Sequence, residues 1–230
     1  MNLPNALTVG RIAITPLIAV LPFAPATTPR VIAFVLFVIA AISDYADGVL
    51  ARSRKQETTL GKLLDPLADK LLLVGTFVPM WALMQSPNGS FAGSSFGNSD
   101  LSVRSLPFIT PWGDVGLPWW IVLIVLGREL AMTIFRQAAA RRGVVIAAIG
   151  PAKVKTAFQL VWQGGAYLWF AVGTAALLGH WDGALWHGIA FFIGTAGTLL
   201  MSVAVLLTVY SLWLYFSRYG RVFVESRARS

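Results

Sequence analysis

The strongest constraint on the fold is that most of the chain consists of long stretches without a charged side chain. Residues 156–181 and 183–217 contain no Asp, Glu, Lys or Arg, and residues 12–29 and 31–43 are also uncharged. A helix needs about 20 apolar residues to cross the hydrocarbon core of a bilayer. The sequence therefore predicts an all-α integral membrane protein. We expect six transmembrane helices, at residues 7–23, 31–53, 62–84, 118–140, 153–178 and 186–216.

The amino-acid composition agrees with this class and excludes several others. Hydrophobic residues make up 57% of the 230 residues and charged residues only 12%, whereas soluble domains carry about 25% charged residues. A disordered chain, a coiled coil and most soluble enzymes are excluded on these grounds. The absence of cysteine excludes disulfide bonds, thiolate metal sites and a cysteine nucleophile.

The positive charges are concentrated in particular segments between the expected helices. They follow the second helix, surround the segment between the fourth and fifth helices, and occupy the C-terminal tail, whereas the opposite loops hold only Arg30 and Arg104. Because cytoplasmic loops are rich in Lys and Arg, both termini are expected in the cytoplasm. Topology and contact with anionic lipids then account for the net charge of +8, and no nucleic-acid partner is expected.

One segment differs in composition from the rest of the chain. Residues 85–117 are rich in Ser, Gly, Pro and Asn, which is typical of loops. We expect a flexible external loop there and assign it no chemistry. No internal repeat or second domain is evident, so residues 1–230 are expected to form a single membrane domain.

Four aspartates lie within the second and third expected helices. Asp44 and Asp47 are three residues apart in the second helix, and Asp65 and Asp69 are four residues apart in the third. Residues at these spacings share one face of a helix. A carboxylate at membrane depth costs several kcal/mol unless it faces a polar cavity or a partner. Four of them in two consecutive helices therefore predict a functional site.

Small residues share these two helix faces with the aspartates. Gly48 and Ala51 follow the aspartates of the second helix by four residues each, and Gly61 precedes the first aspartate of the third helix by four. Opposed faces of this kind would place four carboxylates beside flat backbone, where Mg²⁺ and a phosphorylated group could bind. In the alternative interpretation, the aspartates pair with basic residues at the membrane edge, namely Arg52, Lys62 and Lys70.

The complete pattern resembles the motif of the CDP-alcohol phosphotransferases. It is Asp44-x2-Asp47-Gly48-x2-Ala51-Arg52-x8-Gly61-x3-Asp65-x3-Asp69, and all eight motif positions match. Members of this family are membrane enzymes of six helices that usually form homodimers. They transfer a phosphatidyl or related group from a CDP-linked donor to an alcohol and release CMP. The resemblance implies the same fold, a homodimer and the same reaction type here.

Further residues resemble the bacterial branch of the family that makes phosphatidylglycerophosphate. This likeness covers roughly residues 1–80 and 118–165, includes Arg11, and fades over the last two helices. It implies that the donor is CDP-diacylglycerol and that the acceptor is sn-glycerol 3-phosphate. The products would be phosphatidylglycerophosphate and CMP. It also implies a multi-pass protein of the bacterial cytoplasmic (inner) membrane, with its active site facing the cytoplasm.

The resemblance also implies roles for individual residues. Two divalent ions, Mg²⁺ or Mn²⁺, would be held by Asp44, Asp47 and Asp65, with Asp69 as a shared ligand and as general base for the acceptor hydroxyl. The residues expected to bind the CDP-linked donor are Asn5, Thr8, Asp44, Gly48, Ala51, Arg52 and Gly61. The residues expected to bind the acceptor phosphate are Arg128, Arg136, Lys153 and Lys155.

Several alternatives remain open from the sequence. The acceptor could be inositol phosphate, serine or phosphatidylglycerol, because the aspartate motif belongs to the donor and the metal ions. A more distant alternative is a cation transporter that uses the aspartates as its ion site. For single residues, Arg52 could be a topological anchor, Arg128 could pair with Glu129, and Asn5 and Thr8 could serve in helix capping or packing.

Overall fold

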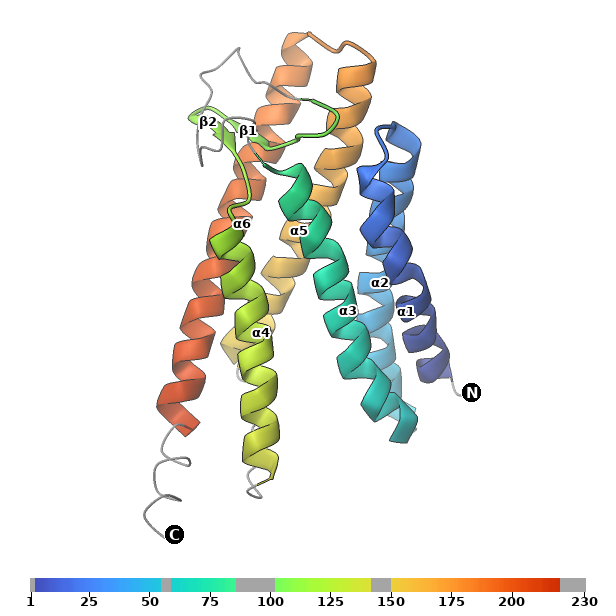
Figure 1. Cartoon of the computed structure of the whole chain (residues 1–230), viewed down its shortest axis with the longest axis vertical. Helices are drawn as coiled ribbons and strands as arrows, with labels where there is room; N and C mark the ends of the chain where they lie inside the picture. The colour runs from blue at the N-terminus through green and yellow to red at the C-terminus, as the bar shows by residue number, and fades with distance from the viewer. Residues whose placement is uncertain (1–2, 55–58, 86–101, 142–149, 220–230) are drawn as a thin grey trace. The chain divides into compact units, whose positions relative to one another are not determined.

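The computed structural model describes residues 3–54, 59–85, 102–141 and 150–219 (Figure 1). Within these ranges, the side chains of residues 3–4, 45–54, 59–63, 65 and 151–153 are not described. The elements, in chain order, are α1 (Leu3–Val20), the short 3-10 helix η1 (Leu21–Phe23), α2 (Thr27–Arg54), α3 (Thr59–Leu83), β1 (Phe108–Thr110), β2 (Gly113–Val115), α4 (Trp119–Ala140), α5 (Gly150–Leu178) and α6 (Ala184–Tyr219).

Each of the six helices expected from the sequence corresponds to one observed α-helix, and the bounds differ by a few residues. In the described part of the chain, four stretches are long and apolar enough to cross a membrane. They are Asn5–Phe23, Thr27–Asp44, Pro66–Leu83 and Ala184–Tyr219. These helices fit an all-α membrane protein, and the number of crossings and the side of the termini stay predictions. The 36 residues of α6 measure about 54 Å at 1.5 Å per residue, more than a bilayer core of about 30 Å.

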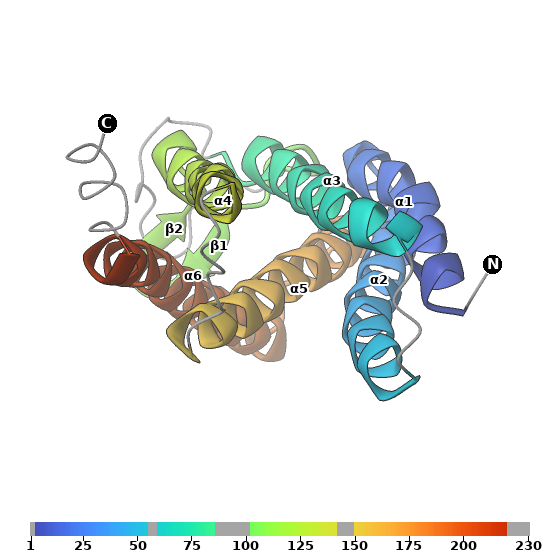
Figure 2. The ribbon, with the colours of Figure 1, turned by 90° about the horizontal axis from the view of Figure 1, so that it is seen from below.

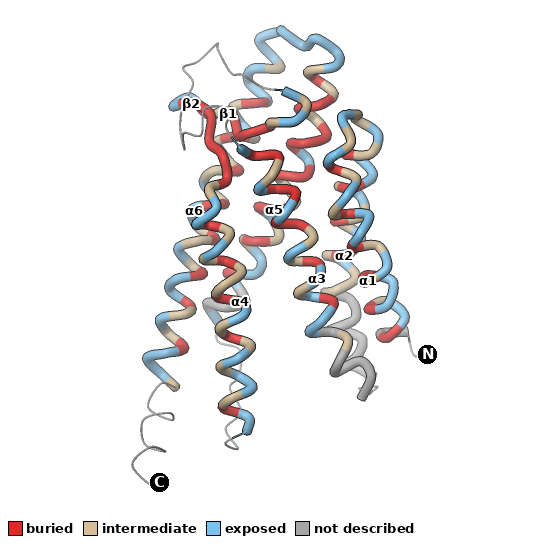
Figure 3. The backbone as a smooth tube through the Cα atoms, viewed as in Figure 1, coloured by how far each residue is buried: buried red, intermediate tan, exposed pale blue. Residues whose placement is uncertain are grey.

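Large apolar side chains are exposed along the described helices, and Figure 3 colours the backbone by the burial of each residue. Leu17, Ile42, Leu123, Phe192 and Leu206 are 51%, 62%, 61%, 75% and 69% exposed. A monomeric soluble protein rarely exposes contiguous apolar surface on this scale. The outward faces are therefore suited to contact lipid.

The chain divides into two compact units, which we describe separately. The first contains residues 1–117 and 163–197, and the second contains residues 118–162 and 198–230. In the first unit, α1, α2 and α3 lie side by side in both Figure 1 and Figure 2. This arrangement places α1 in contact with both α2 and α3, the two helices that carry the predicted aspartates.

Helices α1 and α3 approach closely at a glycine. A β-carbon at Gly75 would lie 2.9 Å from Cγ2 of Thr15, closer than side chains normally pack, so a larger residue there would push α1 away from α3. Tyr167 of α5 packs at the same level. Its hydroxyl lies 3.2 Å from the carbonyl oxygen of Ile18 and 3.4 Å from that of Gly75. The latter carbonyl lacks its helical donor because Pro79, four residues later, has no N–H.

Residues 102–117 form an ordered structure, so the expectation of a flexible loop is wrong for this described half of the segment. Strands β1 and β2 pair in an antiparallel hairpin, and Leu106 and Phe108 are fully buried. The indole Nε1 of Trp169 donates to the carbonyl oxygens of Leu106 and Pro107 at 3.1 and 3.0 Å. The polar composition of the segment indicated a loop. It could not show that Leu106 and Phe108 pack against other parts of the first unit.

Glycines of α6 and an arginine of α2 hold the hairpin segment in place. A β-carbon at Gly197 would lie 2.5 Å from Cζ of Phe108, and one at Gly194 would collide with the backbone of Ile109. Arg30 is 1% exposed and donates to the carbonyl oxygens of Pro22 and Val103 and to the hydroxyl of Thr174. The hairpin is thus part of the packed core of the first unit.

In the second unit, the buried residues of α4 recur every three or four positions. Four of them, Ile121, Val125, Arg128 and Met132, follow this spacing, and the fifth, Ala139, lies seven positions after Met132. These spacings give one inward face on an α-helix. Phe135 and Phe216 pack with ring centroids 5.3 Å apart. Arg128 therefore lies on the packed face of α4 and needs polar partners there.

Candidate active site

Two of the predicted metal ligands come together on one arginine in the first unit. Nη1 of Arg11, on α1, lies 3.0 Å from Oδ1 of Asp69 on α3 and also contacts Oδ1 of Asp44 on α2. The arginine side chain is 1% exposed, whereas the side chains of Asp44 and Asp69 are 45% and 60% exposed. The carboxylates are therefore joined on their buried side by a cation and remain accessible on the other side.

Most of the remaining donor and metal residues have known positions on the backbone only. Asp47, Gly48, Ala51 and Arg52 lie on α2, and Gly61 and Asp65 lie on α3, but their side chains lie outside the described residues, as does that of Lys153 on α5. Among the described side chains, no three His, Cys, Asp or Glu residues lie close enough together to hold a metal ion. The full four-aspartate site therefore stays a prediction.

The two described carboxylates have the chemistry that a divalent cation requires. Carboxylate oxygens are preferred ligands of Mg²⁺ and Mn²⁺, and Asp44 and Asp69 reach one point from two different helices. A cationic group is already bound between them, which shows that the location favours positive charge. The described residues thus fit two of the four predicted ligands.

The inward face of α1 is polar along its first turns. Asn5, Thr8, Arg11 and Thr15 are all buried, with exposed fractions of 7%, 1%, 2% and 5%, and their spacing places them on one face. Asn5 lies in the first turn of α1, which begins at Leu3, and Thr8 lies in the next turn. Both side chains share the helix face that carries Arg11.

Sequence reasoning did not single out Arg11 as a site residue. The alternative interpretation paired the aspartates with Arg52, Lys62 or Lys70. Among the described side chains, Arg11 contacts Asp44 and Asp69, and the side chains of Arg52 and Lys62 lie outside the described residues. A charged residue inside an otherwise apolar helix indicates a functional contact, and this pattern could have identified Arg11. Its two partners could not be named, because the contacts depend on how three helices pack.

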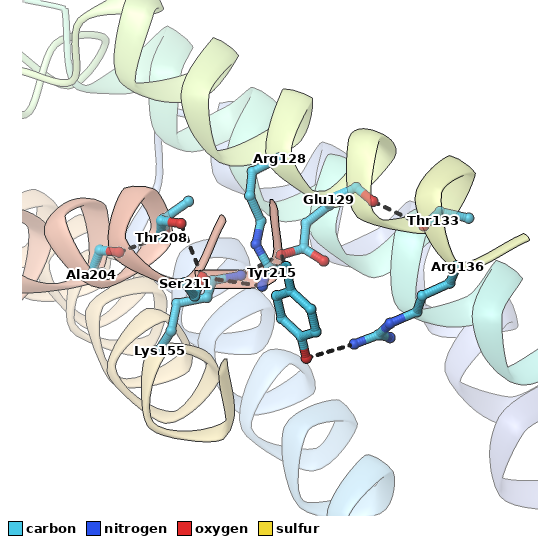
Figure 4. Close-up of polar contacts among 9 residues, drawn as sticks. All are labelled: Arg128, Glu129, Thr133, Arg136, Lys155, Ala204, Thr208, Ser211 and Tyr215. Carbon is cyan, nitrogen blue, oxygen red and sulfur yellow. Dashed lines mark hydrogen bonds and ion pairs between the residues drawn. The ribbon is translucent and has the colours of Figure 1, made fainter. Parts of the chain in front are cut away.

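In the second unit, three of the predicted acceptor-binding side chains form one polar cluster (Figure 4). Nη1 of Arg128 lies 2.9 Å from Oε1 of Glu129, and Nη2 lies 3.1 Å from the hydroxyl of Ser211. Nζ of Lys155, from α5, also contacts Oε1 of Glu129. The predicted alternative partner of Arg128 is therefore present, and it contacts a second cation as well.

Arg136 belongs to the same cluster through a tyrosine. Its Nη2 lies 3.3 Å from the hydroxyl of Tyr215 on α6. The guanidinium carbons of Arg136 and Arg128 lie 5.8 and 6.0 Å from the centroid of the Tyr215 ring, within reach of a cation–π interaction. Among the described side chains, the cluster with Lys155 holds three cations against the one carboxylate of Glu129, so it carries positive charge that suits an anion.

The sequence did not predict the polar residues of α6 in this cluster. Ser211 and Tyr215 are buried, at 1% and 0% exposed, and they lie in a stretch without charge. They are four residues apart, and Thr208 precedes Ser211 by three, so the three form a polar stripe on α6. That spacing was available in the sequence, although an apolar helix gives no indication of which neighbour its stripe contacts.

Comparison with known proteins identifies the family. The family model described as CDP-alcohol phosphatidyltransferase matches residues 1–223. The chain belongs to this family, as the aspartate motif implied.

Curated relatives cover nearly the whole chain. A protein of Bacillus subtilis (strain 168) named CDP-diacylglycerol–glycerol-3-phosphate 3-phosphatidyltransferase is 30% identical over 94% of this chain and 94% of its own length. A protein of Mycobacterium tuberculosis (strain H37Rv), named as a probable phosphatidylglycerophosphate synthase, is 30% identical over 90% of this chain and 77% of its own length. A relative from Rickettsia felis, with the same name as the Bacillus protein, is 28% identical over 96% of this chain and 97% of its own length.

Proposed function

We propose that this protein transfers the phosphatidyl group of CDP-diacylglycerol to sn-glycerol 3-phosphate, giving phosphatidylglycerophosphate and CMP. The observation that carries the proposal is family membership over residues 1–223, combined with the convergence of Asp44 and Asp69 of the family motif. Relatives matched over most of the chain are named for this reaction. The protein is accordingly a transferase of phospholipid biosynthesis.

The carboxylates of α2 and α3 hold the metal ions that act on the CDP-linked donor. Asp44 and Asp69, with Asp47 and Asp65, hold two divalent ions, Mg²⁺ or Mn²⁺, as the resemblance implies. When bound, such ions neutralise the charge of the pyrophosphate and of the departing CMP. Gly48, Ala51, Arg52 and Gly61, with Asn5 and Thr8, bind the CDP-linked donor.

Asp69 is the proposed general base. Its side chain is 60% exposed, so a bound alcohol can reach it. The acceptor hydroxyl oxygen forms a bond to the lipid phosphorus as its proton passes to the carboxylate of Asp69. The bond from this phosphorus to CMP breaks, and CMP leaves.

The cluster of Arg128, Arg136, Lys153 and Lys155 binds the phosphate of the acceptor. Guanidinium groups suit phosphate recognition because they donate two parallel hydrogen bonds. Arg136 is exposed, whereas Arg128 is 6% and Lys155 3% exposed. The excess of cations over carboxylates in this cluster supports the assignment and favours glycerol 3-phosphate over serine, which is zwitterionic and has no phosphate.

We further propose the membrane topology and assembly that the resemblance implies. Six helices cross the bacterial inner membrane, both termini and the active site face the cytoplasm, and two copies form a homodimer. The four apolar helices of the described residues and the bacterial relatives support a multi-pass membrane protein.

An acceptor panel tests the reaction. Purified protein in detergent is given Mg²⁺ and CDP-diacylglycerol, and CMP release is followed with glycerol 3-phosphate, inositol phosphate, serine or phosphatidylglycerol. We expect release with glycerol 3-phosphate, and none after chelation with EDTA or in Asp69→Asn. Asp182→Asn is the matched control, because Asp182 is an exposed aspartate in the turn before α6, and it should retain the wild-type rate.

The outcomes separate the parts of the proposal. Release with a different acceptor would keep the donor chemistry and overturn the assignment of the Arg128 cluster. Near-normal release by Asp69→Asn would overturn the assignment of the base. No release with any acceptor by folded protein would overturn the reaction itself.

A further inference from the structure

In the contact between Arg11 and the two carboxylates, the arginine is buried and the aspartates are partly exposed. Both Asp44 and Asp69 use Oδ1, and both contact the same nitrogen, Nη1 of Arg11. The arginine side chain is almost wholly buried, and roughly half of each aspartate side chain is exposed. The guanidinium thus lies behind the carboxylates, on the side away from any ligand that approaches them.

The charges explain why a cation is needed at this point. Two carboxylates brought to one nitrogen repel each other, and the repulsion is large where water is scarce. One guanidinium balances only one of the two negative charges. Arg11 alone therefore does not neutralise the two carboxylates.

Arg11 is held by packing that does not involve the carboxylates. The hydroxyl of Thr15 donates to the carbonyl oxygen of Arg11 at 2.7 Å, and Thr15 lies at the close approach of α1 to Gly75 of α3. Helix α1 is therefore fixed against α3 one turn away from the guanidinium. This arrangement gives the two aspartates a fixed reference point on a third helix.

We propose that Arg11 is a positioning residue, which holds the carboxylates of Asp44 and Asp69 together so that their exposed side binds a divalent cation. The inference rests on the proposed function, because the cation is the one that the reaction uses. Groups that hydrogen-bond to metal-binding carboxylates orient them, and their loss costs about 10- to 100-fold in metal affinity. A guanidinium that merely occupied the cation site would have the opposite effect, since its removal would strengthen metal binding.

Binding of Mn²⁺ without substrate tests the proposal. Thermal unfolding of the purified protein in detergent is measured over a series of Mn²⁺ concentrations for wild type, Arg11→Met and Arg11→Lys. For Arg11→Met, the Mn²⁺ concentration that gives half of the maximal stabilisation should rise by about 10- to 100-fold. Arg11→Lys should recover most of the loss, because both carboxylates contact a single nitrogen that an ammonium group can replace.

Arg30→Met is the matched control. Arg30 is an equally buried arginine of the same unit, 1% exposed, and it contacts two carbonyl oxygens and a hydroxyl. This variant should unfold at a lower temperature, yet its response to Mn²⁺ should match that of wild type. If Arg11→Met does not fold, Arg11→Gln replaces it, with the same expected shift, because glutamine keeps an N–H donor and removes the charge.

Three results would overturn the proposal. Unchanged or tighter Mn²⁺ binding in Arg11→Met would show that Arg11 is structural or competes with the metal. An equal shift in Arg30→Met would show a general effect of lost packing. If Mn²⁺ does not stabilise the wild-type protein, the proposed cation site is wrong. CMP release in the acceptor panel then decides whether the proposed reaction also fails.

Discussion

The carboxylate of Glu129 lies 2.9 Å from Nη1 of Arg128, although the two residues are neighbours on α4. Consecutive residues of a helix normally point about 100° apart, so long side chains must bend toward each other to meet. The same carboxylate also contacts Lys155 of α5. Glu129 thus balances part of the positive charge where the acceptor phosphate is proposed to bind.

Arg128→Ala should raise the KM for glycerol 3-phosphate more than the KM for CDP-diacylglycerol. A hydrogen bond to a charged group is worth about 1.5–3 kcal/mol, which corresponds to roughly 10- to 100-fold. Steady-state CMP release measures both constants. Arg141→Ala is the control, because Arg141 is exposed at the end of α4. Equal changes in both KM values would argue against a role in acceptor binding.

Glu129→Gln should lower the apparent Tm, because it leaves the buried cations Arg128 and Lys155 without their shared carboxylate. Removing one partner of a buried ion pair costs about 3–5 kcal/mol, or roughly 5 °C or more in a chain of this size. Glycerol 3-phosphate should stabilise the variant more than it stabilises wild type, since its phosphate supplies the missing negative charge. Thermal unfolding with and without glycerol 3-phosphate measures this, and equal stabilisation of both proteins would contradict it.

Gly75→Leu should destabilise the first unit and reduce CMP release. A β-carbon there would already lie 2.9 Å from Thr15, so the larger side chain must push α1 away from α3 and move Arg11 from Asp69. Overpacking of this kind costs about 1–3 kcal/mol. Gly10→Leu, on α1, is the control, because a β-carbon at Gly10 would meet nothing within 4 Å. If the two variants unfold at the same temperature and release CMP at the same rate, the close packing of α1 against α3 at Gly75 is disproved.

Gly194→Val should displace the β1–β2 hairpin from α6, because the new side chain collides with the backbone of Ile109. We expect protease cleavage between residues 102 and 117 to increase. The free energy of unfolding should fall by about 1–3 kcal/mol, which lowers the Tm. Gly188→Val, also on α6, should change neither property, since a β-carbon there would meet nothing within 4 Å. Proteolysis followed by mass spectrometry locates the cuts, and an unchanged cleavage pattern in Gly194→Val would refute the docking.

The helices were predictable because apolar content is a local property of the sequence. The aspartates were predictable because their spacing matches a family motif, and the structure brings Asp44 and Asp69 together. The hairpin of residues 102–117 was missed, because its order depends on Trp169, Gly194 and Gly197, far away in the sequence.

The partners of the predicted residues were harder to foresee than the residues themselves. Arg11 contacts residues 33 and 58 positions away, and Arg128 contacts Ser211, 83 positions away. Such pairs follow from which helix faces meet. The sequence of an apolar helix predicts that the helix is buried or faces lipid. It does not predict which polar residue of a neighbouring helix lies opposite.

The contacts of Arg30 have a consequence for the order in which the protein assembles during its synthesis. Pro22, eight residues earlier, is made before Arg30, but Val103 and Thr174 follow 73 and 144 residues later. When α2 has just been synthesised, its arginine therefore still lacks two of these three acceptors. These contacts can be completed only after α5 has been synthesised, so the packing of this end of α2 depends on segments that are made much later.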